Sequence, residues 1–131
     1  MNSVSATTHT SIEYDILHAL EDDVADYDPE IMLELIDIFL QDSAEHLVGI
    51  GRAIEGGDYR KIEISAHSLR SSSATFGALI LSNFCMRLEK CARTSQNECI
   101  VETLAEARQE FALVEAILRV QRVKWVKAVA E

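Results

Sequence analysis

The residues around His67 have the types and spacing that suit phosphoryl transfer. At about 100° of rotation per helical residue, the apolar side chains of this segment gather on one side, and His67 lies about 140° from the first of them, Ile62. We therefore expect His67 to face solvent, where part of its imidazole is neutral at cellular pH and can act as a nucleophile. Arg70 follows three residues later, so its guanidinium can hydrogen-bond a phosphoryl oxygen and offset its charge. The pair predicts phosphorylation of the imidazole, followed by transfer to a docked partner.

Other residues on the same helix face predict where that partner docks. Ser71 and Ala74 have short side chains, which leave a second protein room to approach the ring, and Glu63 shares the face. Hydrolysis is a poorer fit, because no Ser or Cys nucleophile has an oxyanion-hole glycine motif and no acidic residue is evident to orient His67 as a base. A metal site on Glu63 and His67 would have only two ligands, so we expect no metal.

The remaining histidines and cysteines predict no further site. None of the other histidines has enough ligand-type neighbours for metal binding, so we expect surface or structural roles for His9, His18 and His46. The cysteines are odd in number and lack C-x-x-C spacing, which favours neither a disulfide framework nor a thiolate zinc site. We expect free thiols that fill small apolar spaces on helices at Cys85, Cys91 and Cys99.

Composition predicts that helices position these residues. The chain has 131 residues, 48% of them apolar and 26% charged, which is typical of one soluble globular domain. Five glycines and one proline leave too few turn residues for an all-β fold. The predicted fold class is all-α, an antiparallel four-helix bundle with a short extra N-terminal helix. We expect residues 1–10 to form a flexible tail and residues 11–131 to form a single helical domain.

Start and stop signals predict the first two helices. A capping-box pattern at residues 10–13 opens a short helix that carries Ile12 among its apolar residues. Asp28 and Pro29 then begin a long helix, since Asp is a preferred N-cap and Pro suits the first helical position. Its apolar spacing continues to the glycine stop at Gly56-Gly57.

Three further helices follow in the same way. Asp58 caps the helix of His67, and Gly77 marks its end. Helical spacing continues over residues 79–92, and a second capping box at residues 95–98 precedes a last helix from Ile100 to about Lys127, roughly 28 residues long. The inward face of the His67 helix has apolar or small residues spaced four, three, four and three apart: Ile62, Ala66, Leu69, Ser73 and Phe76.

Charge is distributed unevenly along the chain. The formal net charge is −10, so we expect neither nucleic-acid binding nor attraction to an anionic membrane surface. Residues 1–51 hold acidic side chains and no Lys or Arg, whereas basic residues outnumber acidic ones between Asp58 and Arg93. This basic segment suggests an anionic target near His67. No apolar run approaches the roughly 18 residues of a membrane span and no signal peptide opens the chain, so membrane insertion is not expected and we predict a cytoplasmic location.

The stretch from His67 to Ala78 resembles the active-site signature of histidine-containing phosphotransfer (HPt) domains. That signature runs His, any residue, Leu, Lys or Arg, Gly, then small residues, and Gly-Ala after a hydrophobic residue. The resemblance covers roughly Pro29 to Glu89, and Ser71 stands where the family usually has Gly. Further anchors match on both sides of the signature: Phe39, Leu47, Ile50, Ala53, Gly57-Asp58 and Ala66 before it, and Leu81, Cys85, Leu88 and Glu89 after it.

The resemblance implies a phosphorelay intermediate that is not itself an enzyme. His67 would take a phosphoryl group from an aspartyl phosphate on the receiver domain of a response regulator or a hybrid histidine kinase, and pass it to another receiver. Arg70 stands where the family's basic residue stabilises phosphohistidine. No cofactor is expected on this chain, because Mg²⁺ would sit on the partner receiver domain. The alternative, which Ser71 favours, is an inactive HPt-like module that docks and occludes a receiver.

Overall fold

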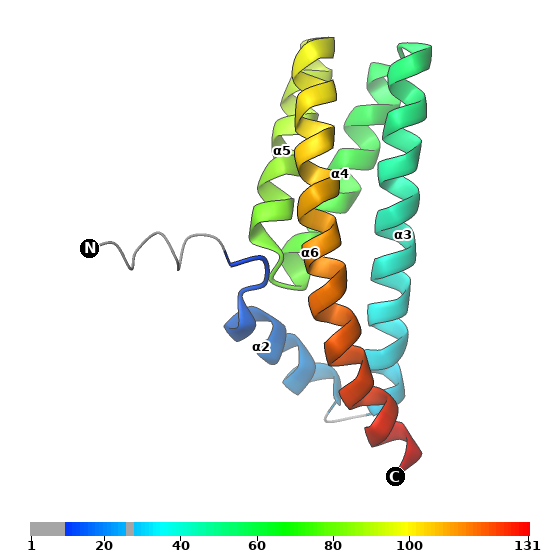
Figure 1. Ribbon diagram of the computed structural model, residues 1–131, viewed down its shortest axis with the longest axis vertical. Helices are drawn as coiled ribbons and strands as arrows, with labels where there is room; N and C mark the ends of the chain where they lie inside the picture. The colour runs from blue at the N-terminus through cyan, green and yellow to red at the C-terminus, as the bar shows by residue number, and fades with distance from the viewer. Residues whose placement is uncertain (1–9, 26–27) are drawn as a thin grey trace, which may run out of the picture.

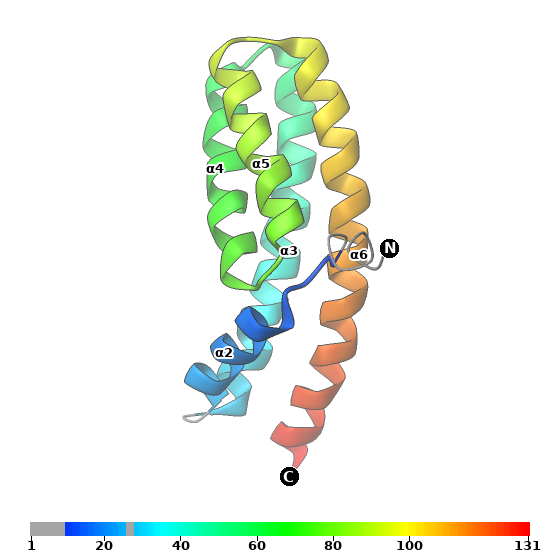
Figure 2. The same cartoon turned by 90° about the vertical axis from the view of Figure 1, so that its left-hand side faces the viewer.

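The computed structural model describes residues 10–25 and 28–131, and every regular element in these ranges is a helix (Figure 1). Four helices form an antiparallel bundle: α3 (Pro29–Gly56), α4 (Tyr59–Thr75), α5 (Leu79–Arg93) and α6 (Asn97–Ala130). The short helix α2 (Tyr14–Ala25) lies beyond the turn between α4 and α5 (Figure 2). The predicted fold class is confirmed. The tail predicted for residues 1–10 lies outside the described residues, except for Thr10.

The bundle has a packing order that the sequence left open. Both α4 and α6 pack against α3 and against α5, while in the described residues no Cα atom of α4 lies within 8 Å of a Cα atom of α6. These two helices therefore occupy diagonal corners, and α5 is the neighbour of α4 that completes the surroundings of His67. None of the helices in the described ranges combines the length and the apolar character that crossing a membrane requires.

The predicted caps of α3 and α4 are confirmed. The Asp28 carboxylate accepts a hydrogen bond from the Glu30 backbone N–H at 3.0 Å, directly before the first turn of α3. Gly57 ends α3 with φ of 66°, a conformation that glycine adopts without steric cost. The Asp58 carboxylate accepts from the Lys61 backbone N–H at 3.1 Å and begins α4.

The predicted start of the first helix is wrong by several residues. Helix α2 begins at Tyr14, because the Glu13 backbone N–H donates to the Gly77 carbonyl at 2.8 Å and so ties the preceding segment to the α4–α5 turn. Ile12 is buried in the core from this bent, non-helical segment rather than from a helix. At the other end of α2, the buried carboxylate of Glu21 accepts from the indole N–H of Trp125 at 3.0 Å, which fastens α2 to the end of α6.

The second predicted capping box is also wrong. Ser95 has φ of 54° and donates its backbone N–H to the Ala92 carbonyl, so it closes the end of α5 instead of capping α6. Gln96 is the N-cap and makes no side-chain capping bond. Helix α6 has 34 residues and extends further in both directions than the predicted helix of roughly 28 residues.

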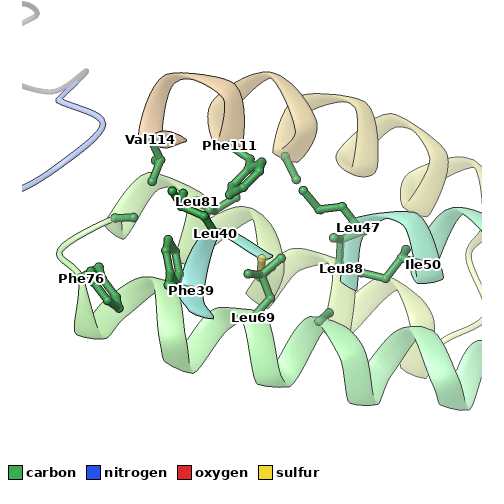
Figure 3. Packing of buried hydrophobic residues seen from close by; sticks show 14 of the residues in the cluster. Phe39, Leu40, Leu47, Ile50, Leu69, Phe76, Leu81, Leu88, Phe111 and Val114 are labelled. Atoms are coloured by element: carbon green, nitrogen blue, oxygen red, sulfur yellow. The ribbon is translucent and has the colours of Figure 1, made fainter. Parts of the chain in front are cut away.

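The core confirms the predicted inward face of α4. Ile62, Ala66 and Leu69 are fully buried, and Phe76 stacks on Phe39 of α3 with 4.5 Å between ring centroids (Figure 3). Ser73 is fully buried as well. Because this face is fixed by packing, the opposite face of α4 is held toward solvent.

The predictions for the cysteines are confirmed for one thiol and wrong for the other two. Cys85 is free and buried, and burial raises the pKa of its thiol to about 12, helped by the nearby carboxylate of Glu89. Cys91 and Cys99 form a disulfide between the end of α5 and the start of α6, with 6.0 Å between their Cα atoms. Spacing gave no sign of this pairing, because the turn between two helices brings the partners together.

Candidate functional site

His67 lies in the middle of α4 and points out of the bundle. Its side chain is 58% exposed, as the helix geometry predicts. Arg70 follows one turn later with its side chain 34% exposed. Of the small residues predicted at a docking surface, Ser71 is exposed and Ala74 is half-buried. The structure thus brings His67, Arg70 and Ser71 to one accessible face of α4.

The residue that completes the site is Glu89, which comes from α5. Its carboxylate oxygen Oε2 lies 3.0 Å from Nδ1 of His67, and its Oε1 lies 3.0 Å from Nε of Arg70. The Glu89 side chain is only 4% exposed, so the exposed imidazole contacts a buried carboxylate. The expectation that no acidic residue orients His67 is therefore wrong.

Packing between α4 and α5 explains why Glu89 reaches the histidine. The Ser82 hydroxyl of α5 donates to the backbone carbonyl of Arg70 at 3.0 Å and fixes the register of the two helices. Glu89 continues the buried face of α5 that includes Cys85. A glutamate at a buried helical position needs a cationic or hydrogen-bonding partner. The signal in the sequence was therefore the place of Glu89 on the same helix face as the apolar residues of α5.

The contact with Glu89 determines which nitrogen of His67 is available for chemistry. An ionised carboxylate only accepts hydrogen bonds and a guanidinium only donates them, so Nδ1 cannot hydrogen-bond both Glu89 and Arg70. We assign the hydrogen of Nδ1 to the shorter contact, the one with Glu89 at 3.0 Å, and Arg70 then makes no hydrogen bond to the ring. The lone pair of the neutral ring then lies on Nε2, the nitrogen that Glu89 does not engage. Arg70 Nη2 lies 3.2 Å from Nδ1, and the guanidinium is held there by its ion pair with Glu89. The site therefore offers one accessible nucleophilic nitrogen with a cation beside it.

Glu63 is held by two arginines beside the site. Its carboxylate is bound by Arg93 of α5, with Nε to Oε2 at 3.0 Å, and by Arg60, with Nη1 to Oε1 at 3.5 Å. The Glu63 side chain is 24% exposed, and Arg93 also lies 3.7 Å from Glu89. Glu63 is therefore part of the charged network that surrounds the site. Within the described residues no three potential metal ligands lie together.

Ile64 is an apolar residue near the site that the sequence did not single out. It lies three residues before His67 on α4, and it is 55% exposed. A large apolar side chain held in solvent next to a reactive group suits contact with a partner protein. The available signal was its position: Ile64 lies between Ile62 and Ala66, which both face the core, so helical rotation turns it outward.

Comparisons with known proteins identify the family and the fold. The family described as the Hpt domain matches residues 34–122. A relative from rice, histidine-containing phosphotransfer protein 1, is 27% identical over 114 residues, which are 85% of this chain and 75% of the rice protein. The crystal structure of histidine-containing phosphotransfer protein B from Pseudomonas aeruginosa is similar with a TM-score of 0.81 and 27% identity, covering 88% of this chain and 97% of that one. The maize protein ZmHP2, at 19% identity and a TM-score of 0.75 over 91% of this chain and 87% of its own, shares the fold.

Proposed function

This chain belongs to the Hpt domain family, whose members transfer phosphoryl groups on histidine in phosphorelays, and we propose that His67 is the residue that carries the group. The observation that supports this best is the contact of an exposed imidazole, 58% accessible, with a buried carboxylate at 3.0 Å. That arrangement orients the ring and leaves Nε2 free. The family works with histidine kinases and receiver domains. Receiver domains of response regulators or hybrid histidine kinases are the partners we propose here, in the cytoplasm.

The transfer step follows from the tautomer of His67. The lone pair of Nε2 attacks the phosphorus of an aspartyl phosphate on the receiver, a nitrogen–phosphorus bond forms, and the phosphorus–oxygen bond breaks with its electrons going to the aspartate carboxylate. The ring then carries positive charge while its hydrogen stays on Nδ1. Glu89, in contact with that hydrogen, stabilises the charge as it develops. The reverse reaction delivers the group to a second receiver.

Arg70 and the small residues supply the rest of the proposed function. The guanidinium of Arg70, held by Glu89, is placed to hydrogen-bond the oxygens of a phosphoryl group on His67. Ser71, Ala74 and Ile64 form the surface that the receiver contacts, with Glu63 at its edge. We also propose that this chain uses no cofactor of its own and that Mg²⁺ is held by the receiver, where it neutralises the transferred group.

A labelling experiment tests this assignment. The chain is incubated with a receiver carrying a labelled aspartyl phosphate, and we expect acid-labile, alkali-stable label to appear on it. His67→Gln should accept no label while keeping its helical circular dichroism, because the side chain is exposed. His46→Gln is the matched control, since His46 is half-buried on α3 and should leave labelling unchanged. Label on the His67 variant would refute the site, and receiver binding without any label on the unaltered chain would indicate an occluding module instead.

A further inference from the structure

The two ends of the Cys91–Cys99 disulfide differ in their access to solvent. Cys91 is 6% exposed at the end of α5, whereas Cys99 is half-buried in the first turn of α6. A surface hollow of about 440 Å³ opens beside this turn and is lined by Gln96, Asn97, Glu98, Cys99 and Glu102. A small molecule therefore reaches the disulfide from the side of Cys99.

The bundle does not need this bond to stay assembled. Both α5 and α6 contribute buried apolar residues to one core along their length, and Arg87 of α5 lies 3.6 Å from Glu106 of α6. The disulfide encloses only the turn between them, with a sequence separation of 8. Because a disulfide that closes a short loop constrains the unfolded chain less than one that closes a long loop, its reduction should leave the four helices packed. In the cytoplasm, the location proposed above, disulfides are rare and usually transient.

We propose that Cys99 is a site of thiol–disulfide exchange, at which low-molecular-weight thiols and disulfides open and close the bond to Cys91. In the reducing direction a thiolate attacks Sγ of Cys99, and the sulfur–sulfur bond breaks with its electrons going to Cys91, which takes up a proton. A second thiol then displaces Cys99 from the mixed disulfide. Two small thiols become one disulfide, and this chain gains two electrons and two protons. Oxidation follows the same steps in reverse, through the same mixed disulfide.

The charge of the hollow determines which reagents exchange fastest. Glu98 and Glu102 line it, and neither has an ion pair within the part of the chain that the structure describes. Arg93 lies in the loop that the disulfide closes, but its Nε is 3.0 Å from Oε2 of Glu63 on α4. Two unpaired carboxylates beside the sulfur attract a cationic reagent and repel an anionic one.

The exchange site lies at the edge of the charged network around His67. Cys91 follows Glu89 by two residues on α5, and Arg93 lies 3.7 Å from Glu89. Reduction frees the turn that carries Arg93, so the two redox states differ at the end of α5. Exchange at Cys99 requires no phosphoryl chemistry, and its test is therefore independent of the function proposed for His67.

Counting thiols in the folded chain tests the exchange. After treatment with cystamine, a cationic disulfide, alkylation in denaturant should find one free thiol, that of the buried Cys85. After treatment with cysteamine under native conditions it should find three, while the helical circular dichroism is unchanged. Three thiols after cystamine treatment, or a bond that opens only when the helices unfold, would overturn the proposal.

Single substitutions test which sulfur exchanges. Cys91→Ser leaves the thiol of Cys99 without its partner, and Cys99→Ser leaves that of Cys91. With cystamine, the first variant should form its mixed disulfide about tenfold faster than the second, because Cys99 is the more exposed of the two. Mass mapping of peptides identifies the modified residue in each variant. Equal rates, or faster reaction of Cys91, would contradict the assignment to Cys99.

Reagents of opposite charge test the hollow. The Cys91→Ser chain should prefer cystamine over dithiodiglycolate, an anionic disulfide, and replacing Glu98 and Glu102 by Gln should reduce that preference about fivefold at low ionic strength. The matched control replaces Glu30 and Glu34 by Gln, which removes the same charge from exposed positions at the other end of the bundle (Figure 2). Its preference should stay unchanged. Equal effects of the two double variants would show that the hollow does not guide the reagent.

Discussion

Replacing Glu89 with Gln should slow phosphoryl transfer without removing it. The carboxylate is 4% exposed and contacts Nδ1 of His67 and Nε of Arg70, each at 3.0 Å. A hydrogen bond to a charged group contributes about 1.5–3 kcal/mol, against about 1 kcal/mol for a neutral one. The glutamine oxygen still accepts from Nδ1–H, so the change removes about 0.5–2 kcal/mol from the stabilisation of the charged ring. Because about 1.4 kcal/mol corresponds to a factor of ten, we expect transfer to be slowed about tenfold.

Single-turnover transfer from one phosphorylated receiver, measured by rapid quench at saturating receiver concentration, isolates this step. Glu63→Gln is the matched control, since that carboxylate belongs to the same charged network through Arg93 and does not contact His67. Its transfer rate should stay within about twofold of the unaltered chain, the size expected for an exposed ion pair. Unchanged transfer by Glu89→Gln, or equal losses in both variants, would refute the role given to Glu89. Thermal unfolding of each variant shows whether the fold is kept.

Three further predictions concern stability. Gly77→Ala should lower the free energy of unfolding by about 1–3 kcal/mol in urea titrations, because φ at Gly77 is 81° and a Cβ there would lie 2.6 Å from the Glu13 carbonyl oxygen. An unchanged midpoint would mean that the segment before α2 does not dock at this turn. Trp125→Phe removes the hydrogen-bond donor to Oε2 of the buried Glu21 and leaves Lys124 beside Oε1, so thermal unfolding should show a loss of about 1–3 kcal/mol. The pKa of Cys85 is raised to about 12 from 9.0, so the unfolded chain loses this proton first and stability should fall as pH rises from 9.0 toward 12. Cys85→Ala should show a shallower decline over that range, and equal slopes would contradict the burial of the thiol.

Most of the fold could be predicted because its signals are local. Asp28 with Pro29, and Asp58 after the glycine stop, determine helix ends through contacts within a few residues. Apolar spacing identified the buried face of α4 for the same reason, since every residue on it belongs to one helix. The two helix starts that were predicted wrongly depend on contacts that helix-start patterns do not include, one between residues far apart in the sequence and one within a turn. Glu13 bonds to Gly77, and Ser95 completes the end of the preceding helix.

The site divides in the same way. The outward position of His67 and the nearness of Arg70 follow from rotation along one helix, and the structure agrees with both. Glu89 could not be assigned to His67, because their contact depends on which helices are neighbours and in what register. Apolar periodicity shows neither which helices are neighbours nor their relative register. The Cys91–Cys99 disulfide escaped prediction for the same reason, since its partners belong to different helices.

The charged network around His67 shows why a phosphoryl group suits this position. Arg60, Arg70 and Arg93 surround the carboxylates of Glu63 and Glu89, so three positive and two negative charges leave one formal positive charge beside the imidazole. Without the carboxylates, three cations on neighbouring turns would repel one another. With them, the arginines are held in place and the remaining positive charge meets the incoming anion. Because Glu89 is buried on α5, this balance is set by the packing of α4 against α5 and exists before any partner binds.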